Sequence, residues 1–316
     1  MLNRLINPIV KPSLPRAAIG FRREGISVVG LQKQGGAFTL SRAATVELPE
    51  NALQPSFNEQ NLVELHEILL TLNQVMTAAG LQEQKRWSVS LPADTARMSI
   101  LTLDAPAKSN NELKEVLNWK AERAFGAAAN EMRMAFQPLT PDVSKRIRYF
   151  VVSIRLEVLA EYENLFGIFD WHVGLVMPRH ISEAQWLMAA NHEQTNQDTL
   201  MVSLQAEGFT AILLRGQQPS VVRSVSCNED EREDELYRLL LFYRDRIASV
   251  NPDAILQKLL LVGDNFQKDR LREIAFETLG NDIRILESND VGLVLPNEIR
   301  FQDVAGPAGL ASLAWR

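Results

Sequence analysis

Two stretches of the chain show the same order of apolar and polar positions. Residues 17–48 contain three apolar runs, separated by the polar turn 22–25 and by the pair Gly35–Gly36. Residues 199–226 repeat this order, with a polar break at 205–208. Short apolar runs joined by tight polar turns are typical of β-hairpins. Each stretch therefore predicts three β-strands in succession.

Each three-stranded stretch is followed by a helical pattern and then by a short apolar run. In the first copy, residues 59–79 carry leucines and a methionine at helical spacing, and the apolar run 87–91 follows. In the second copy, Asn228 is a suitable N-cap for a helix, and the apolar run 258–262 comes next. Two copies of the order βββαβ, about 180 residues apart, predict a duplicated α/β fold.

Residues 92–150 interrupt this order in the first copy. The runs 98–103, 131–139 and 146–153 have the character of strands. Residues 110–123 form a helical pattern that begins after a polar cap region. We therefore expect a small β-α-β-β subdomain inserted into the first half.

The polar stretch 191–198 (NHEQTNQD) is the best candidate for a domain boundary. We expect an N-terminal arm at residues 1–16, a first domain at 17–191 that contains the insert 92–150, and a second domain at 199–316. The remaining predicted elements are helices at 156–169, 180–191, 229–247, 268–279 and 306–316, and strands at 171–177 and 283–286.

The N-terminal arm has two interpretations. Leu2, Leu5 and Ile6 share one helical face with other apolar residues, but Pro8 and Pro12 limit any helix to a couple of turns. The arm is either a short docking or membrane-surface segment, or a terminal arm that packs on its own domain or is disordered.

Composition places the chain among ordinary globular proteins. Its 316 residues suffice for a sizeable core in one or two domains. The net charge of −6 argues against a general nucleic-acid binder. With the single cysteine Cys227 no intrachain disulfide can form, which fits a reducing compartment. No signal peptide or membrane span is recognisable, so we expect a soluble cytoplasmic protein.

Residues for catalysis or metal binding are scarce. The four histidines, His66, His172, His180 and His192, lack the spacing of metal ligands, so no metal site is predicted. The acidic residues after Cys227 would raise its thiol pKa, which disfavours a nucleophile. The acidic run EDEREDE that follows Asn228 is either a site for a metal or basic partner or a solvated first helical turn.

The polar turns at 22–25 and 205–208 are the only candidates for phosphate loops, and the order of motifs around them resembles a known family. The chain is similar to the type IV pilus assembly PilM family, which has an actin-like ATPase fold and is related to FtsA and to the GspL cytoplasmic domain. The stretches that carry this resemblance are IGFRREGISVVGL, LKEVLNWKAERAF, VRSVSCNEDEREDELYRLLLFYRDRIA, LLLVGDN and GLASLAWR. It implies a duplicated actin-like, ribonuclease H-like fold with the insert as its small subdomain.

The phosphate loops depart from the pattern of nucleotide-binding members. Those proteins begin each hairpin with a D-x-G-like sequence, whose aspartate helps to hold the metal. Here Arg22 and Arg23 stand at the first loop, and Ser203 and Gln205 stand at the second. The glycine pair on the adenosine side is reduced to Gly263 followed by an aspartate. Since magnesium is held by carboxylates and phosphates, we expect no cofactor, no metal and no ATPase activity.

Alternatives remain open at this point. Arg22 and Arg23 could neutralise an anion without a metal, or could be two surface arginines on a turn. The protein could also be an actin-like ATPase whose loops are misaligned here. A third alternative is the cytoplasmic domain of a GspL-like type II secretion protein.

The resemblance implies a scaffold rather than an enzyme. PilM-like proteins lie at the cytoplasmic face of the inner membrane and bind the short cytoplasmic tail of PilN beside the inserted subdomain. A PilN-like partner and other pilus assembly components are therefore expected, without nucleic acid and without a span of the protein's own. A bound peptide gains from apolar anchors and from pairing to a strand edge. The candidate groove residues are Leu103, Leu117, Trp119, Phe125 and Phe136.

Overall fold

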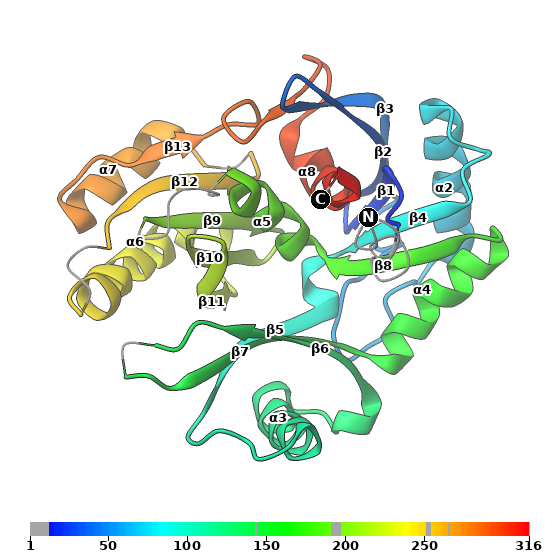
Figure 1. The fold of residues 1–316 in the computed structure, drawn as a ribbon. Helices are drawn as coiled ribbons and strands as arrows, with labels where there is room; N and C mark the ends of the chain where they lie inside the picture. The colour runs from blue at the N-terminus through cyan, green and yellow to red at the C-terminus, as the bar shows by residue number, and fades with distance from the viewer. Residues whose placement is uncertain (1–12, 143, 191–196, 251–253, 265, 316) are drawn as a thin grey trace, which may run out of the picture.

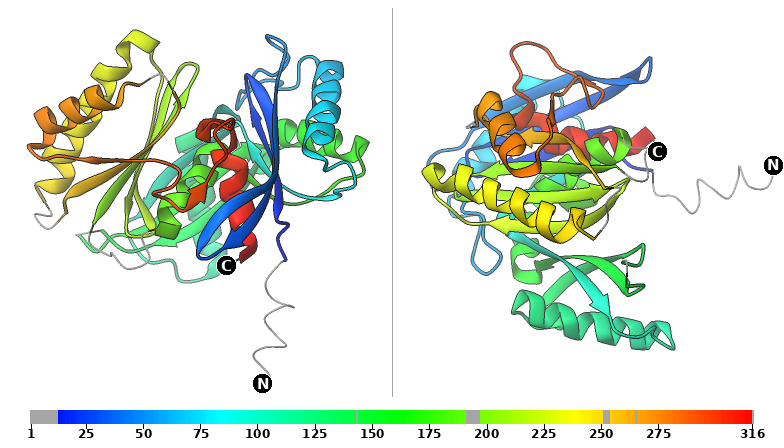
Figure 2. Two further views of the ribbon diagram at one scale, coloured as in Figure 1. Left: turned by 90° about the horizontal axis from the view of Figure 1, so that it is seen from above. Right: turned by 90° about the vertical axis from the view of Figure 1, so that its left-hand side faces the viewer.

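The computed structural model describes residues 13–142, 144–190, 197–250, 254–264 and 266–315 (Figure 1). The predictions for the arm up to residue 12 and for the boundary stretch 191–196 lie outside the described residues. Two sheets with helices on their faces form the main body, and a third, smaller sheet with one helix lies beside it (Figures 1 and 2).

The first sheet has the order β14-β3-β2-β1-β4-β8. Strands β1, β2 and β3 form two antiparallel hairpins. Strand β4 pairs with β1 in parallel, and β8 pairs with β4 in parallel. Parallel neighbours need a crossover, and helices supply it in this chain. The strands are β1 (Ala17–Arg22), β2 (Gly25–Gln34), β3 (Ala37–Glu47), β4 (Arg86–Leu91), β8 (His172–Pro178) and β14 (Leu293–Val294).

The second sheet has the order β11-β10-β9-β12-β13. Three antiparallel strands are again followed by two strands that join in parallel, in the same order as β3-β2-β1-β4-β8. This repetition confirms the predicted duplicated α/β fold. The strands are β9 (Asp198–Gln205), β10 (Gly208–Arg215), β11 (Gln218–Val225), β12 (Leu256–Val262) and β13 (Arg284–Leu286).

The insert has the predicted order of elements. Its sheet, β5-β7-β6, is antiparallel, and α3 packs on one face through Leu117 and Phe125. The predicted cap of α3 is present, since the Ser109 hydroxyl accepts a hydrogen bond of 3.1 Å from the Glu112 amide. The elements are β5 (Ala96–Leu103), α3 (Asn110–Phe125), β6 (Met132–Leu139) and β7 (Ile147–Arg155).

The other helices form three layers with the two large sheets (Figure 2). Helices α2 and α4 cover the outer face of the first sheet, and α6 and α7 cover that of the second. Helices α5 and α8 lie between the sheets, in an apolar core that both sheets share. The helices are α2 (Leu65–Ala79), α4 (Leu156–Ile168), α5 (Arg179–Ala190), α6 (Arg232–Phe242), α7 (Lys268–Leu279) and α8 (Phe301–Ser312), with short turns η1 (Ala93–Thr95), η2 (Ala129–Glu131), η3 (Glu229–Glu231), η4 (Tyr243–Ala248) and η5 (Leu313–Trp315).

Two predicted helix starts are wrong. Helix α2 begins at Leu65 rather than at residue 59, because the Asn61 side chain donates to the Ser56 and Glu59 carbonyls and holds that segment as a loop. Helix α8 begins at Phe301 rather than at residue 306, and Pro307 lies inside it. Proline is tolerated best in the first turn of a helix, so the sequence favours a helix start next to Pro307.

The chain returns to the first sheet near its C-terminus. Strand β14 pairs with β3, and α8 packs on β1, β2 and β4 as well as on α5. The approach of α8 is very close, since a Cβ on Gly20 of β1 would lie 2.7 Å from Pro307. Residues 293–312, which the sequence analysis assigned to the second domain, therefore lie on the first sheet.

Candidate functional site

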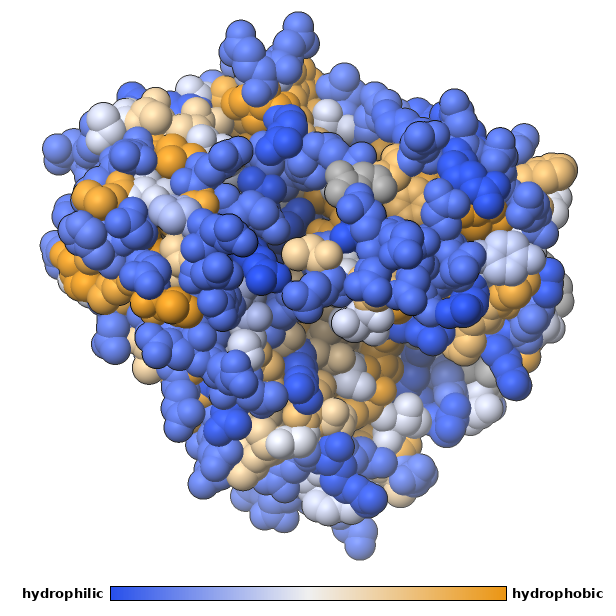
Figure 3. All heavy atoms as spheres, turned by 180° about the vertical axis from the view of Figure 1, so that it is seen from behind, coloured by the Kyte–Doolittle hydropathy of each residue, from blue (hydrophilic) through white to orange (hydrophobic). Residues whose placement is uncertain are grey.

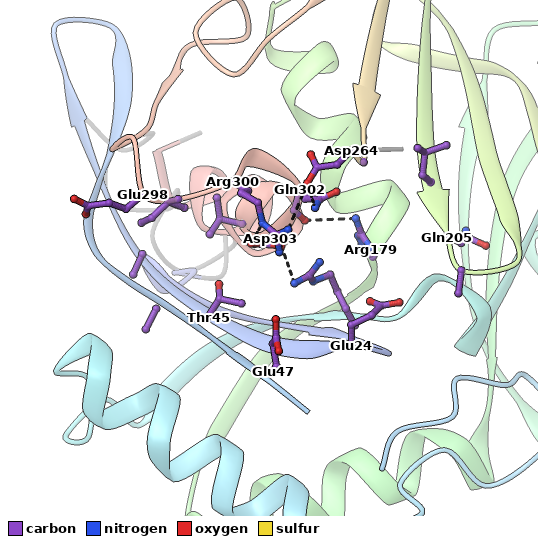
Figure 4. Close-up of a pocket in the computed structure, with 18 of the residues that line it drawn as sticks. Glu24, Thr45, Glu47, Arg179, Gln205, Asp264, Glu298, Arg300, Gln302 and Asp303 are labelled. Atoms are coloured by element: carbon purple, nitrogen blue, oxygen red, sulfur yellow. Dashed lines mark hydrogen bonds and ion pairs between the residues drawn. The ribbon is translucent and has the colours of Figure 1, made fainter. Parts of the chain in front are cut away.

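Two hollows meet between the halves of the molecule. The first, called the cleft here, is a cavity of 760 Å³ between the two large sheets. The β1–β2 turn, the β9–β10 turn, the start of α8 and the segment after β12 form its walls (Figure 4). The second, called the groove, is a cavity of 750 Å³ between the main body and the insert. Both share part of their walls, including Arg22 and Gln205.

Both hairpins at the cleft close with two-residue turns. Arg22 pairs with Gly25 across the first turn, and Gln205 pairs with Gly208 across the second. A glycine is required at 208, where φ is 114° and a Cβ would lie 1.9 Å from the Val225 carbonyl oxygen. Turns of this length offer few backbone N–H groups for wrapping a phosphate.

Arg22 is bound by the protein's own carboxylate. Its guanidinium lies 2.8 Å from Asp303 of α8, and the two side chains are only 12% and 9% exposed. Arg300 also contacts Asp303, with its Nε at 2.9 Å. Burial lowers the pKa of Arg22, Arg179 lowers it further, and Asp303 opposes this effect. An internal ion pair thus occupies the place where a free cation could have met an anion.

We expect Asp303→Asn to destabilise the protein by about 3–5 kcal/mol, because it leaves the buried Arg22 without its counter-charge. Thermal or urea unfolding at neutral pH measures the effect. Asp264→Asn is the matched control: this carboxylate is 53% exposed and lies 3.5 Å from Arg300. Its loss should cost less than about 1 kcal/mol. Equal effects of the two variants would contradict the importance of the buried pair.

The remaining charges of the cleft oppose a polyanion. Six carboxylates and four guanidinium groups line it, so its net charge is negative. Glu24, Glu47 and Glu298 surround the cavity in Figure 4, and none of them has an ion-pair partner within the part of the chain that the structure describes. A triphosphate in this cavity would meet repulsion at short distance.

The residues predicted at the second loop have structural roles. Ser203 is fully buried and does not line the cleft. Gln205 donates from its side chain to Thr210 at 2.9 Å, while its carbonyl accepts a bond of 2.7 Å from Arg232. Gly263 has φ of 140°, and a Cβ there would lie 2.6 Å from Leu204.

Arg23 lies on the tip of its hairpin, at the groove rather than in the cleft. It pairs with Glu207 of the opposite hairpin at 3.3 Å, with side chains 43% and 79% exposed. Exposed pairs of this kind contribute little to stability. The two turns therefore touch at their tips, and this contact lies where the cleft meets the groove.

No group of three or more metal-binding side chains gathers at any point in the described residues. Cys227 is partly buried, and its thiol pKa is raised, first by desolvation and then by neighbouring acidic residues, while Arg232 opposes them. The sequence argument for Cys227 named the acidic residues but missed desolvation, which is the larger cause.

His180 at the start of α5 is a buried histidine beside the cleft. Desolvation, assisted by Arg179, lowers its pKa to about 3, from 6.5. Neither ring nitrogen has a hydrogen-bond partner among the described residues. The imidazole is therefore neutral in the folded protein at physiological pH.

Stability should fall as the pH drops below 6.5, because protons bind the unfolded His180 before the folded one. The loss should be about 2 kcal/mol between pH 7 and pH 5. Urea unfolding across this range, compared with His180→Leu, isolates the contribution: the variant should lose less stability on acidification. Parallel pH profiles for both proteins would show that His180 does not titrate on unfolding.

The groove has three sides, and the β1–β2 turn with Arg179 of α5 completes its lining. The loop 54–60 of the first half forms one side, η1 with the start of β5 and the end of α3 forms another, and the β9–β10 turn with the end of β11 closes the third. Phe57 is 4% exposed and packs into the core of the insert from the loop.

The face opposite to Figure 1 is mostly hydrophilic with separate apolar patches (Figure 3).

The structure places the five predicted partner-binding residues in or around the core of the insert. Leu103, Leu117 and Phe125 are 3% exposed or less, and Phe136 is half-buried against the same cluster. Trp119 is 52% exposed, with the Arg123 guanidinium 5.0 Å from its ring. Among these five, Phe125 lines the groove. Their role in partner binding stays a prediction.

Sequence reasoning missed most of the groove wall. It did not name the loop 54–60, Asp94 or Glu207, which come from three distant parts of the chain. The one available signal was an aromatic residue, Phe57, inside a polar loop. A buried aromatic anchor in a loop indicates that the loop is fixed against something.

The repeated strand order and the three-stranded insert define a protein of the duplicated actin-like class. The chain is similar to a chain of the solved PilM–PilN type IV pilus biogenesis complex, at 17% identity over 96% of this chain and 100% of that chain, with a TM-score of 0.75. It also matches the cytoplasmic domain of EpsL, an inner-membrane component of the type II secretion system of Vibrio cholerae, at 10% identity over 95% of this chain and 93% of that chain (TM-score 0.46).

A protein of unknown function with an actin-like ATPase fold from Bacteroides thetaiotaomicron matches at 11% identity over 93% of this chain and 94% of that chain (TM-score 0.47). No protein-family model matches the sequence, and no curated protein matches it significantly. Among the described residues, no helix is long and apolar enough to cross a membrane.

Proposed function

We propose that this protein is a non-catalytic scaffold of type IV pilus or related envelope assembly machinery. In this proposal it lies at the cytoplasmic face of the inner membrane. It binds the short cytoplasmic tail of a PilN-like membrane protein in the groove and hydrolyses no ATP. The observation that carries the proposal is the contrast between the two hollows: in the cleft the buried Arg22 is paired with Asp303 and carboxylates outnumber guanidinium groups, whereas the groove lies beside the insert and combines apolar and polar residues from distant parts of the chain.

The cleft supports a role without nucleotide. Asp303 pairs with Arg22 at 2.8 Å, and further carboxylates give the cavity a negative charge. A nucleotide would have to break this buried pair and would find no carboxylate set arranged for magnesium within the described residues. The free energy of nucleotide binding would therefore have to offset the loss of the contact between Arg22 and Asp303.

The groove supports a role in peptide binding. It lies between the body and the insert, and its walls combine apolar side chains with polar and charged ones, as in sites that hold a peptide. The similar solved structure is a complex of PilM with PilN. A tail bound here would connect this protein to the membrane through its partner, which gives the proposed localisation.

The test is calorimetric titration with a synthetic peptide that copies the cytoplasmic tail of the PilN-like protein from the same genome. We expect a micromolar dissociation constant, as is usual for short peptides whose ordering offsets part of the contact energy. Ala124→Trp should weaken binding at least tenfold, because Ala124 lines the groove.

The matched control is Asn111→Trp, which adds the same side chain to an exposed position of α3 outside the groove. This variant should bind like the unmodified protein. Absence of binding to the unmodified protein, or equal binding by both variants, would contradict the proposed function.

A further inference from the structure

The groove carries carboxylates that lack partners. Asp94, Glu24 and Glu59 line it, and none of them has an ion pair within the described residues. Asp94 also accepts no hydrogen bond there, although it lies on η1, the short turn at the junction of body and insert. Three acidic groups thus line one hollow without a salt-bridge partner among the described residues.

The arginines of the groove are already engaged elsewhere. Arg22 is held by Asp303, and Arg23 pairs with Glu207. Arg97 donates to the Phe125 carbonyl at 2.7 Å and lies over the Phe57 ring. The fourth, Arg179, pairs with the buried Glu183 at 2.5 Å. The contacts of Arg97 are with neutral groups, so its charge remains, and the three unpaired carboxylates face this one uncompensated arginine. The charge left for an occupant of the groove is therefore negative.

The charged groups around Asp94 are also predominantly carboxylates. Desolvation raises its pKa, the carboxylates of Glu207 and Glu24 raise it further, and Arg23 opposes them. The neighbouring carboxylates thus add a cost to a negative charge at this exposed position. An incoming cation would remove that cost.

We propose that the groove selects a basic peptide segment, with a lysine or arginine side chain of the occupant pairing with Asp94. This inference rests on the proposed function and names the chemistry of the partner that the function requires. Cytoplasmic segments close to a membrane span carry an excess of lysine and arginine. The negative charge of the groove and of the whole protein would also steer such a segment toward its site.

The experiment is a double-mutant cycle in calorimetry. The tail peptide and a version with every lysine and arginine replaced by glutamine are each titrated into the unmodified protein, Asp94→Asn and Asp282→Asn. Asp282 is exposed and lies outside the groove, so its variant removes one carboxylate without touching the site. Thermal unfolding of all three proteins shows that they fold alike.

Asp94→Asn should weaken binding of the tail peptide at least tenfold, as expected for a lost charge-assisted contact. The same variant should change binding of the neutral peptide less than twofold, and Asp282→Asn should change neither. Equal loss for both peptides, or equal affinity of the two peptides for the unmodified protein, would overturn the inference and leave the proposed function standing. Absence of binding by both peptides would overturn the proposed function together with the inference.

Discussion

Titration of the protein with ATP and magnesium is expected to give no measurable binding and no hydrolysis. A triphosphate needs a metal, closely approaching amides and unoccupied cations. This cleft offers two-residue turns and an arginine that already binds Asp303. Each lost charged contact costs about 1.5–3 kcal/mol, so two or more of them weaken binding more than a hundredfold.

Calorimetry with ATP, with and without magnesium, measures this directly. Any residual binding should be weak and independent of magnesium, since Arg22 and Arg179 are the groups that could contact phosphate. A micromolar dissociation constant that requires magnesium would contradict the account. It would show that the phosphate loops lie elsewhere and would favour the ATPase alternative.

Gly309→Ala is expected to destabilise the protein by at least about 3 kcal/mol, because the new methyl group has no space. A Cβ at Gly309 would lie 2.0 Å from the Ser182 carbonyl oxygen, where α8 crosses α5. Backbone atoms cannot move aside as a flexible side chain can. The crossing lies in the apolar core shared by both sheets, so a shift there affects the whole body. Thermal unfolding and the yield of folded protein report the effect.

Gly167→Ala in α4 provides the control. It makes the same chemical change inside a helix, but no atom lies within 4 Å of the new Cβ. Since alanine is the better helix former by about 1 kcal/mol, this variant should be unchanged or slightly more stable. A Gly309→Ala protein as stable as the unmodified one would show that the two helices do not cross as closely as described.

The fold could be predicted from the sequence because its signals are local and repeated. Alternating apolar residues and tight turns predicted the six strands β1 to β3 and β9 to β11, and the repetition of this pattern predicted the duplication. The helix α3 was predicted with its cap, since Ser109 makes the capping bond within one turn. Short-range patterns of this kind can be recognised in the sequence without knowledge of the tertiary structure.

The candidate site could be predicted only in part, because its decisive contacts are distant in the sequence. The absence of a D-x-G-like sequence at the two turns could be read directly from Arg22 and Ser203. The capture of Arg22 by Asp303 joins the first strand to the last helix, and no local pattern indicates it. The start of α8 was misplaced by Pro307, so Asp303 was not even expected on a helix.

The groove residues show the same limit. Apolar residues of the insert such as Leu117 were predicted to contact a partner. They pack instead between α3 and the small sheet, in the core of the insert. Periodicity identifies which residues are apolar on one face of a helix, but it does not tell a buried face from a binding face. The groove instead uses loop and turn residues, whose positions depend on the arrangement of three chain segments.

One measurement tests the central claim, that the groove and not the cleft is the functional site. Hydrogen–deuterium exchange of the protein is followed alone, with the tail peptide, and with ATP and magnesium. The account predicts that the peptide slows exchange in residues 54–60 and 93–99, which line the groove, and that ATP changes nothing. Slower exchange at the turns 22–25 and 205–208 with ATP, and none at the groove with the peptide, would contradict it.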